Sequence, residues 1–173
     1  MVRPMAVLIR REIPADVDAI RAVVAAAFAP SPAEALLVDE LRADPGWLPA
    51  LSLVAVDPAG TVIGHVACTR AHVDDAPVLG LGPLSVRPDH HIRGVGSALV
   101  HAVLGAADAL SEPLVVLLGN PAYYHRFGFV LSDQLGIRPP VPGWQPHFQV
   151  RTLAAYTPAL RGDFTYAEPF SRV

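Results

Sequence analysis

The chain has 173 residues, of which 52% are hydrophobic and 17% are charged, and its formal net charge is −3. These values are typical of an ordered protein with a sizeable core, and we expect a single domain over residues 1–173. All 13 basic residues are arginine and they form no basic stripe, which argues against a nucleic-acid partner.

The cysteine content and the hydropathy of the chain bear on the cellular compartment of the protein. The one cysteine, Cys68, excludes an internal disulfide and a cysteine-based zinc site, and it fits a reducing cytoplasm. The apolar stretch Met5–Ile9 is too short for the core of a signal peptide, and no run of about 18 uncharged apolar residues follows it. We therefore expect a cytoplasmic protein with no membrane partner.

The first half of the chain predicts a strand, two helices and an antiparallel sheet. Residues 7–13 are typical of an edge strand. Apolar residues at helical spacing then predict one helix that ends at Pro30 and another that ends near Arg42. Three strands follow, over residues 51–56, 62–73 and 79–86.

The second half alternates helix and strand before its pattern weakens. A helical pattern runs to Leu110, an apolar strand covers residues 114–118, and a tyrosine-rich turn follows. Prolines then break the chain, although residues 148–151 and 163–166 still resemble short strands. The order of elements predicts an α/β protein with a mixed, mostly antiparallel sheet and helices packed on it.

The segment from His91 to Ser97 lies between the third of those strands and the helix, and it predicts an anion site. Backbone N–H groups at a helix start attract phosphate, and Gly94 and Gly96 lack side chains that would block the approach. The glycine spacing does not fit the dinucleotide fingerprint, and a P-loop requires a lysine that this chain lacks. We expect a ligand with a phosphate tail and with its reactive end near Tyr124.

Four segments together resemble the GCN5-related N-acetyltransferase (GNAT) family, in particular a bacterial subgroup of predicted N-acetyltransferases. They are Gly64-His-Val-Ala67, Leu81-Gly-Pro-Leu-Ser-Val86, His91-Ile-Arg-Gly-Val-Gly96 and Gly119–Phe129. The resemblance covers about residues 5–131. It implies a GNAT fold with one splayed pair of strands, and acetyl-CoA as co-substrate.

The resemblance also implies a set of contacts to CoA. Backbone groups of Leu84, Ser85 and Val86 would pair with the pantetheine arm, and a bulge at Pro83 would splay this strand from residues 114–118. The family has Gln or Arg where this chain has His91. The pyrophosphate would bind the loop and helix start formed by His91, Ile92, Arg93, Gly94, Val95, Gly96 and Ser97.

A second set of implied roles concerns the chemistry. Tyr124 aligns with the tyrosine that protonates the departing CoA thiolate in many members of the family. Tyr123 is an alternative phenol, and Asn120 is a further candidate contact to the pantetheine arm. A backbone N–H near Val86 would polarise the thioester carbonyl.

The base that deprotonates the acceptor is less clearly marked. Glu34, on the second predicted helix, is our candidate, and the alternatives are Glu40, His65, His72 and Asp74. Side chains of a strand alternate between its two faces, so His65 and His72 lie on opposite faces of an unbroken strand. At most one of them therefore faces the expected cleft for CoA.

Three functions are compatible with these features. The first is transfer of acetyl from acetyl-CoA to a primary amine by direct attack. The second is a CoA-binding regulatory or partner-binding domain without activity, and the third is a dinucleotide-dependent oxidoreductase. We expect no metal site, because the adjacent residues Asp89, His90 and His91 would seldom converge on one ion. The sequence does not identify the acceptor, which is a small molecule or a peptide amine. It also leaves the oligomeric state open, and a homodimer is one alternative.

Overall fold

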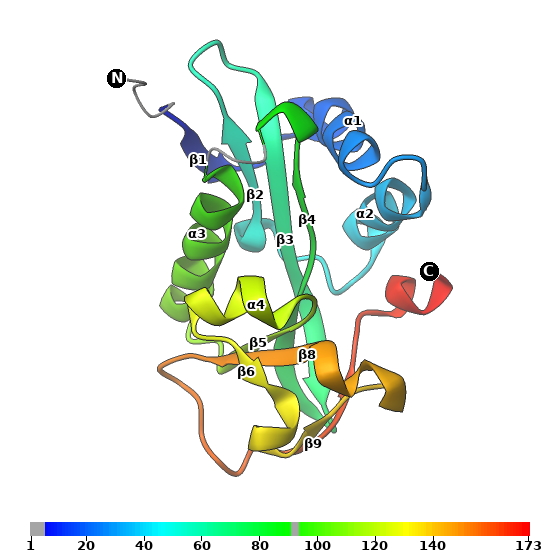
Figure 1. Ribbon diagram of the computed structural model, residues 1–173, viewed down its shortest axis with the longest axis vertical. Helices are drawn as coiled ribbons and strands as arrows, with labels where there is room; N and C mark the ends of the chain where they lie inside the picture. The colour runs from blue at the N-terminus through cyan, green and yellow to red at the C-terminus, as the bar shows by residue number, and fades with distance from the viewer. Residues whose placement is uncertain (1–5, 91–93) are drawn as a thin grey trace.

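The computed structural model describes residues 6–90 and 94–173, and it is built on a nine-stranded sheet with helices on both faces (Figure 1). The helices are α1 (Val17–Ala27), α2 (Ala33–Ala43), α3 (Val95–Ala109) and the short α4 (Pro121–Tyr124). The strands are β1 (Leu8–Arg11), β2 (Ser52–Val56), β3 (Val62–Val73), β4 (Ala76–Val86), β5 (Leu114–Leu118), β6 (Val130–Leu131), β7 (Ile137–Arg138), β8 (Phe148–Thr152) and β9 (Gly162–Thr165).

The strands follow the order β1-β2-β3-β4-β5-β8-β6, and β9 joins the far end of β3. The pairs along that path are antiparallel except for β4 and β5, which are parallel. The parallel pair needs a crossover, and α3 supplies it. The predicted mixed, mostly antiparallel sheet with flanking helices is therefore confirmed.

The predicted bulge and splayed strands are also present. Val66 of β3 lies opposite Leu84, whereas Cys68 lies opposite Leu81, so β4 carries one extra residue across Gly82 and Pro83. A bulge bends its strand and ends regular pairing. β4 pairs with β5 only through Leu79 and Gly80, and the two strands separate beyond that point.

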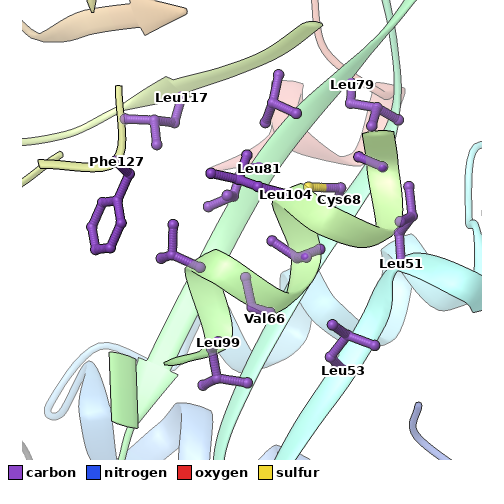
Figure 2. Close-up of a cluster of buried hydrophobic side chains, with 14 of the residues drawn as sticks. Leu51, Leu53, Val66, Cys68, Leu79, Leu81, Leu99, Leu104, Leu117 and Phe127 are labelled. Atoms are coloured by element: carbon purple, nitrogen blue, oxygen red, sulfur yellow. The ribbon is translucent and has the colours of Figure 1, made fainter. Parts of the chain in front are cut away.

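Two apolar clusters hold helices on opposite faces of the sheet. Figure 2 shows the cluster beneath α3, in which side chains of β2, β3, β4 and β5 surround Leu99 and Leu104. On the other face Ile20 and Val24 of α1 and Val38 of α2 pack against β2 and β3. Because the helix faces are apolar at helical spacing, burying them fixes both layers around the splayed strands.

The C-terminal third adds more order than its prolines suggest. Phe148 and Phe164, in the two short predicted strands, are fully buried and their rings meet at 5.3 Å. A short 3-10 helix, Glu168–Arg172, returns the chain to α2, where Ala167 packs with Leu37 and Leu41. Among the described residues, no helix has both the length and the apolarity needed to cross a membrane.

Candidate functional site

The first cavity lies between the end of β4, the start of α3 and the tyrosine-rich turn that follows β5. It has a volume of about 540 Å³ and reaches the start of α3. Its lining joins apolar residues of β4 to polar groups of α3 and α4, and consists of Leu84, Val86, Gly94, Gly96, Ser97, Tyr123 and Arg126. We call it the split cleft.

The start of α3 presents backbone N–H groups to this cleft. Gly94 precedes the helix with a φ of 75°, a left-handed conformation that glycine adopts without strain. The first helical hydrogen bond runs from the N–H of Ala98 to the carbonyl of Gly94, at 3.0 Å. The N–H groups of Val95, Gly96 and Ser97 therefore have no acceptor within the helix and lie at its positive end. The predicted contacts at His91, Ile92 and Arg93 lie outside the described residues.

Tyr123 and Arg126 complete the polar end of the cleft. A side chain added at Gly96 would come within 3.1 Å of the Tyr123 hydroxyl, so this glycine makes room for the phenol. The Arg126 guanidinium lies over the Tyr123 ring at 4.6 Å, and its Nε donates to the Tyr123 carbonyl at 2.8 Å. The sequence reasoning missed Arg126, although a cation in the tyrosine-rich turn, close to a helix start, was a usable signal.

The register of β4 decides which of its backbone groups face the cleft. The N–H of Arg87 donates to Ile63 at 2.9 Å, so Ser85, which lies opposite His65, is also hydrogen-bonded toward β3. Leu84, one residue away, therefore turns its N–H and carbonyl toward the cleft. Ser85 is only 1% exposed and does not line the cleft, so its expected pantetheine contact stays a prediction.

Tyr124 lies beyond the polar end, next to the last residues of β5. Its ring packs edge-on against Tyr123 and Phe129, and a Cβ at Gly119 would come within 2.6 Å of the ring carbon Cε2. Burial, and to a lesser extent the neighbouring Tyr123, raises the pKa of Tyr124 to about 12. The phenol therefore stays protonated and can act as a hydrogen-bond donor across the ordinary pH range.

A second cavity, of about 350 Å³, opens at the bulge of β4. Its lining includes Gly82 and Pro83 of the bulge, Leu118 at the end of β5, and Glu34. The Glu34 carboxylate accepts a hydrogen bond from the Ser31 hydroxyl at 2.9 Å, which fixes it in the first turn of α2. We call this cavity the α2 pocket.

The other candidate bases are placed elsewhere. Glu40 pairs with Arg172 at 3.2 Å, Asp74 accepts from the backbone of Asp163 at 2.9 Å, and His72 is exposed at the far end of β3. None of these residues lines the split cleft or the α2 pocket. Glu34 is thus the one candidate base whose carboxylate faces a cavity at the bulge.

His65 is fully buried and belongs to a structural cluster. Ser52 donates its single hydroxyl proton to Glu12, so it must accept from His65 Nε2, which lies 2.9 Å away. Burial lowers the pKa of His65 against the opposing effect of Glu12, and the ring is neutral. His65 Nδ1 is then a buried acceptor, without a protein partner among the described residues, and the ring lines neither cavity.

Two further candidates are used locally. Asn120 accepts from the N–H of Ala122 at 3.0 Å and caps α4, and it lines neither cavity, so its expected pantetheine contact stays a prediction. Asp89 pairs with His90 at 3.0 Å and with Arg87 at 3.2 Å. Within residues 6–90 and 94–173, no three His, Cys, Asp or Glu side chains gather as a metal site would require.

Comparisons with known proteins agree with this geometry. A family model described as an acetyltransferase (GNAT) domain matches residues 49–131. The chain is 40% identical over 168 residues to the uncharacterised N-acetyltransferase YhbS of Escherichia coli K12, over 95% of this chain and 99% of that relative.

Solved structures give the same result. The crystal structure of YhbS from Escherichia coli in complex with CoA has a TM-score of 0.91 and 37% identity, over 99% of this chain and 96% of the other. A GNAT family acetyltransferase from Brucella melitensis in complex with acetyl-CoA has a TM-score of 0.79 and 34% identity, over 96% and 99% of the two chains. The chain therefore belongs to the GNAT family and is an N-acetyltransferase that uses acetyl-CoA.

Proposed function

We propose that the protein transfers the acetyl group of acetyl-CoA directly to a primary amine held in the α2 pocket, without an acyl-enzyme intermediate. One observation carries the proposal. The split cleft offers an anion site at one end, and the α2 pocket, which contains a carboxylate, opens at the bulge where β4 and β5 separate. A nucleotide tail and an amine could thus meet from opposite faces of the sheet.

The anion site binds the diphosphate. The N–H groups of Val95, Gly96 and Ser97 supply donors, and the exposed Arg126 adds a positive charge. Leu84 turns its backbone donor and acceptor toward the cleft, where they pair with the amide groups of the pantetheine arm as a neighbouring strand would. This pairing draws the thioester toward the bulge.

Glu34 and Tyr124 handle the protons. Glu34 takes a proton from the bound ammonium, and the free amine nitrogen then attacks the thioester carbonyl carbon. A new C–N bond forms, and the nitrogen then loses its second proton to the solvent, where Glu34 also releases the proton it took. The C–S bond breaks, and the sulfur leaves with the bonding pair. Tyr124 gives its proton to that sulfur and regains one from the solvent, so the products are an N-acetyl amine, CoA and one proton.

Tyr124 is a better candidate than Tyr123 for this proton transfer because of its position. Tyr123 lines the cleft with its hydroxyl next to Gly96, at the anion end. The ring of Tyr124 instead rests against Gly119, one residue after Leu118 of the α2 pocket.

Tyr124→Phe tests this assignment. We expect kcat to fall about 10²-fold while the Kd for acetyl-CoA, measured by calorimetry, stays unchanged. Tyr156→Phe, at a residue that packs on the cluster around Phe148 and lines neither cavity, is the matched control and should leave both values unchanged. An unchanged kcat in Tyr124→Phe would remove Tyr124 from the mechanism, and absent acetyl-CoA binding in the wild type would refute the proposal as a whole.

A further inference from the structure

We infer that the acceptor is a primary amine attached to an aromatic or aliphatic body, and that sugars, polyamines and basic peptides are poor acceptors. This inference rests on the proposed function and concerns the chemistry of the α2 pocket. Among the described residues of its lining, Glu34 supplies the one charged side chain. The walls are otherwise mainly apolar and include Phe28, Leu37, Leu118, Trp144 and Phe170.

The C-terminal segment makes the aromatic wall. Phe170 stacks on Tyr166 with ring centroids 4.5 Å apart and an angle of 29° between the planes, and Trp144 meets Tyr166 at 6.5 Å. Arg172, two residues later, pairs with Glu40 of α2 at 3.2 Å. The wall is therefore a packed surface attached to α2, and it offers ring faces to a flat apolar group.

A third cavity extends the apolar space. It has a volume of about 500 Å³ and shares Trp144, Tyr166, Phe170 and Val173 with the α2 pocket. An amine with a body the size of a phenyl or indole ring fits a pocket of about 350 Å³, and the neighbouring cavity leaves room for a longer tail.

The charges of the pocket select against multiply charged acceptors. One ammonium group can pair with Glu34, and the aromatic faces stabilise the same cation further. A polyamine or a basic peptide brings additional cations, but Glu168, the one carboxylate side chain among the described lining of the neighbouring cavity, is paired with Arg172. The hydroxyl groups of a sugar would lose hydrogen bonds to water against an apolar lining.

A panel of amines tests the inference through release of free CoA thiol. A thiol reagent reports on CoA here, because Cys68 is the sole cysteine, is 1% exposed, and has a pKa raised by burial. We expect kcat/KM for 2-phenylethylamine and tryptamine to exceed that for glucosamine, spermidine and a lysine-containing peptide by about 10²-fold. Along propylamine, butylamine, pentylamine and hexylamine, kcat/KM should rise about fourfold per methylene.

A variant pair assigns this selectivity to the wall. Phe170→Ala should lower kcat/KM for 2-phenylethylamine about tenfold and leave propylamine, which is too short to reach the wall, almost unchanged. Leu110→Ala, at the exposed end of α3, removes a similar apolar side chain far from the pocket and should alter neither value.

The possible failures are separable. If acetyl-CoA binds and a polar amine is acetylated as well as 2-phenylethylamine, the inference is wrong and the proposed function stands. If acetyl-CoA binds and the aromatic and aliphatic amines release no thiol, the inference is again wrong. If acetyl-CoA does not bind at all, the proposed function fails with it. An equal loss for propylamine and 2-phenylethylamine in Phe170→Ala would also overturn the role given to the wall.

Discussion

Gly119→Ala isolates the position of the Tyr124 ring from its chemistry. The new methyl carbon would lie 2.6 Å from Cε2 of Tyr124, whereas carbon atoms in contact stay about 3.5 to 4.0 Å apart. The deficit is about 1 Å. Gly119 cannot yield easily, because its N–H donates to His147 and its carbonyl accepts from Gln149, both at 2.9 Å. We therefore expect the tyrosine ring to move.

A displacement of about 1 Å at a catalytic group costs about 10²-fold in rate. The kcat of Gly119→Ala, measured by thiol release with the best amine of the panel, should fall by about that factor. The Kd for acetyl-CoA should stay near the wild-type value, because Gly119 does not line the split cleft. Crowding of the site should also lower the free energy of unfolding by about 1 to 3 kcal/mol, which urea denaturation measures.

Gly105→Ala provides the matched control. A Cβ at Gly105 has no atom within 4 Å, and the residue lies on the exposed side of α3. Alanine is a better helix former than glycine, so this variant should be more stable by about 0.5 to 1 kcal/mol, with unchanged kcat. If Gly119→Ala folds with wild-type kcat, the ring position does not matter for turnover, and the assignment of Tyr124 as the proton donor is wrong.

Four other changes test separate parts of the structure. Arg126→Ala should weaken acetyl-CoA binding about tenfold by calorimetry, with a smaller difference from wild type at high salt, because it removes an exposed cation from the phosphate end. Leu99 of α3 is fully buried against the sheet, and Leu99→Ala should lower the free energy of unfolding by about 2 to 5 kcal/mol, as measured in urea. Burial raises the pKa of Glu12, but the nearby His65 side chain, the hydrogen bond from Ser52 and the charge of Arg42 outweigh it and leave the pKa below its usual value. Wild-type stability should therefore fall as acid protonates Glu12, and it should fall less steeply in Glu12→Gln. Because the pKa of Tyr124 is raised to about 12, its phenolate absorbance should appear only near that pH in the folded protein. The neutral phenol stabilises the fold, so the free energy of unfolding should decrease between about pH 10 and pH 12.

The fold was predictable where one local signal dominated. Apolar residues at helical spacing predicted α1 and α2, and a Pro inside a strand pattern predicted the bulge of β4. Element ends were less accurate: β4 begins at Ala76 instead of Leu79, because its first residues continue the hairpin with β3. The pairing of β8 between β5 and β6 was not predictable, because a proline-rich sequence gives no indication of which strands it will join.

The glycine-rich start of α3 was also predictable, since glycines at a helix start act through the backbone and need no long-range information, and its role as an anion site stays a prediction. Ser85 and Asn120, which the resemblance placed at the pantetheine arm, do not line the split cleft, and the reason is local. Strand register turns the backbone of Ser85 toward His65, and helix capping occupies the Asn120 carbonyl oxygen. Family resemblance identifies a position in the sequence, but strand register and helix capping determine which atoms at that position are available for a ligand.

The α2 pocket, which we propose holds the acceptor, was not predictable from the sequence for a different reason. Its walls come from α2, from the bulge, and from a C-terminal segment more than a hundred residues after α2. No spacing rule connects Glu34 to Phe170, so the pocket exists only once the tail has packed on α2 through Ala167 and Leu37. In the proposed function, the cofactor end relies mainly on backbone atoms of β4 and of the start of α3. Acceptor specificity should therefore change with the tail while CoA binding stays constant, and Phe170→Ala tests that separation directly.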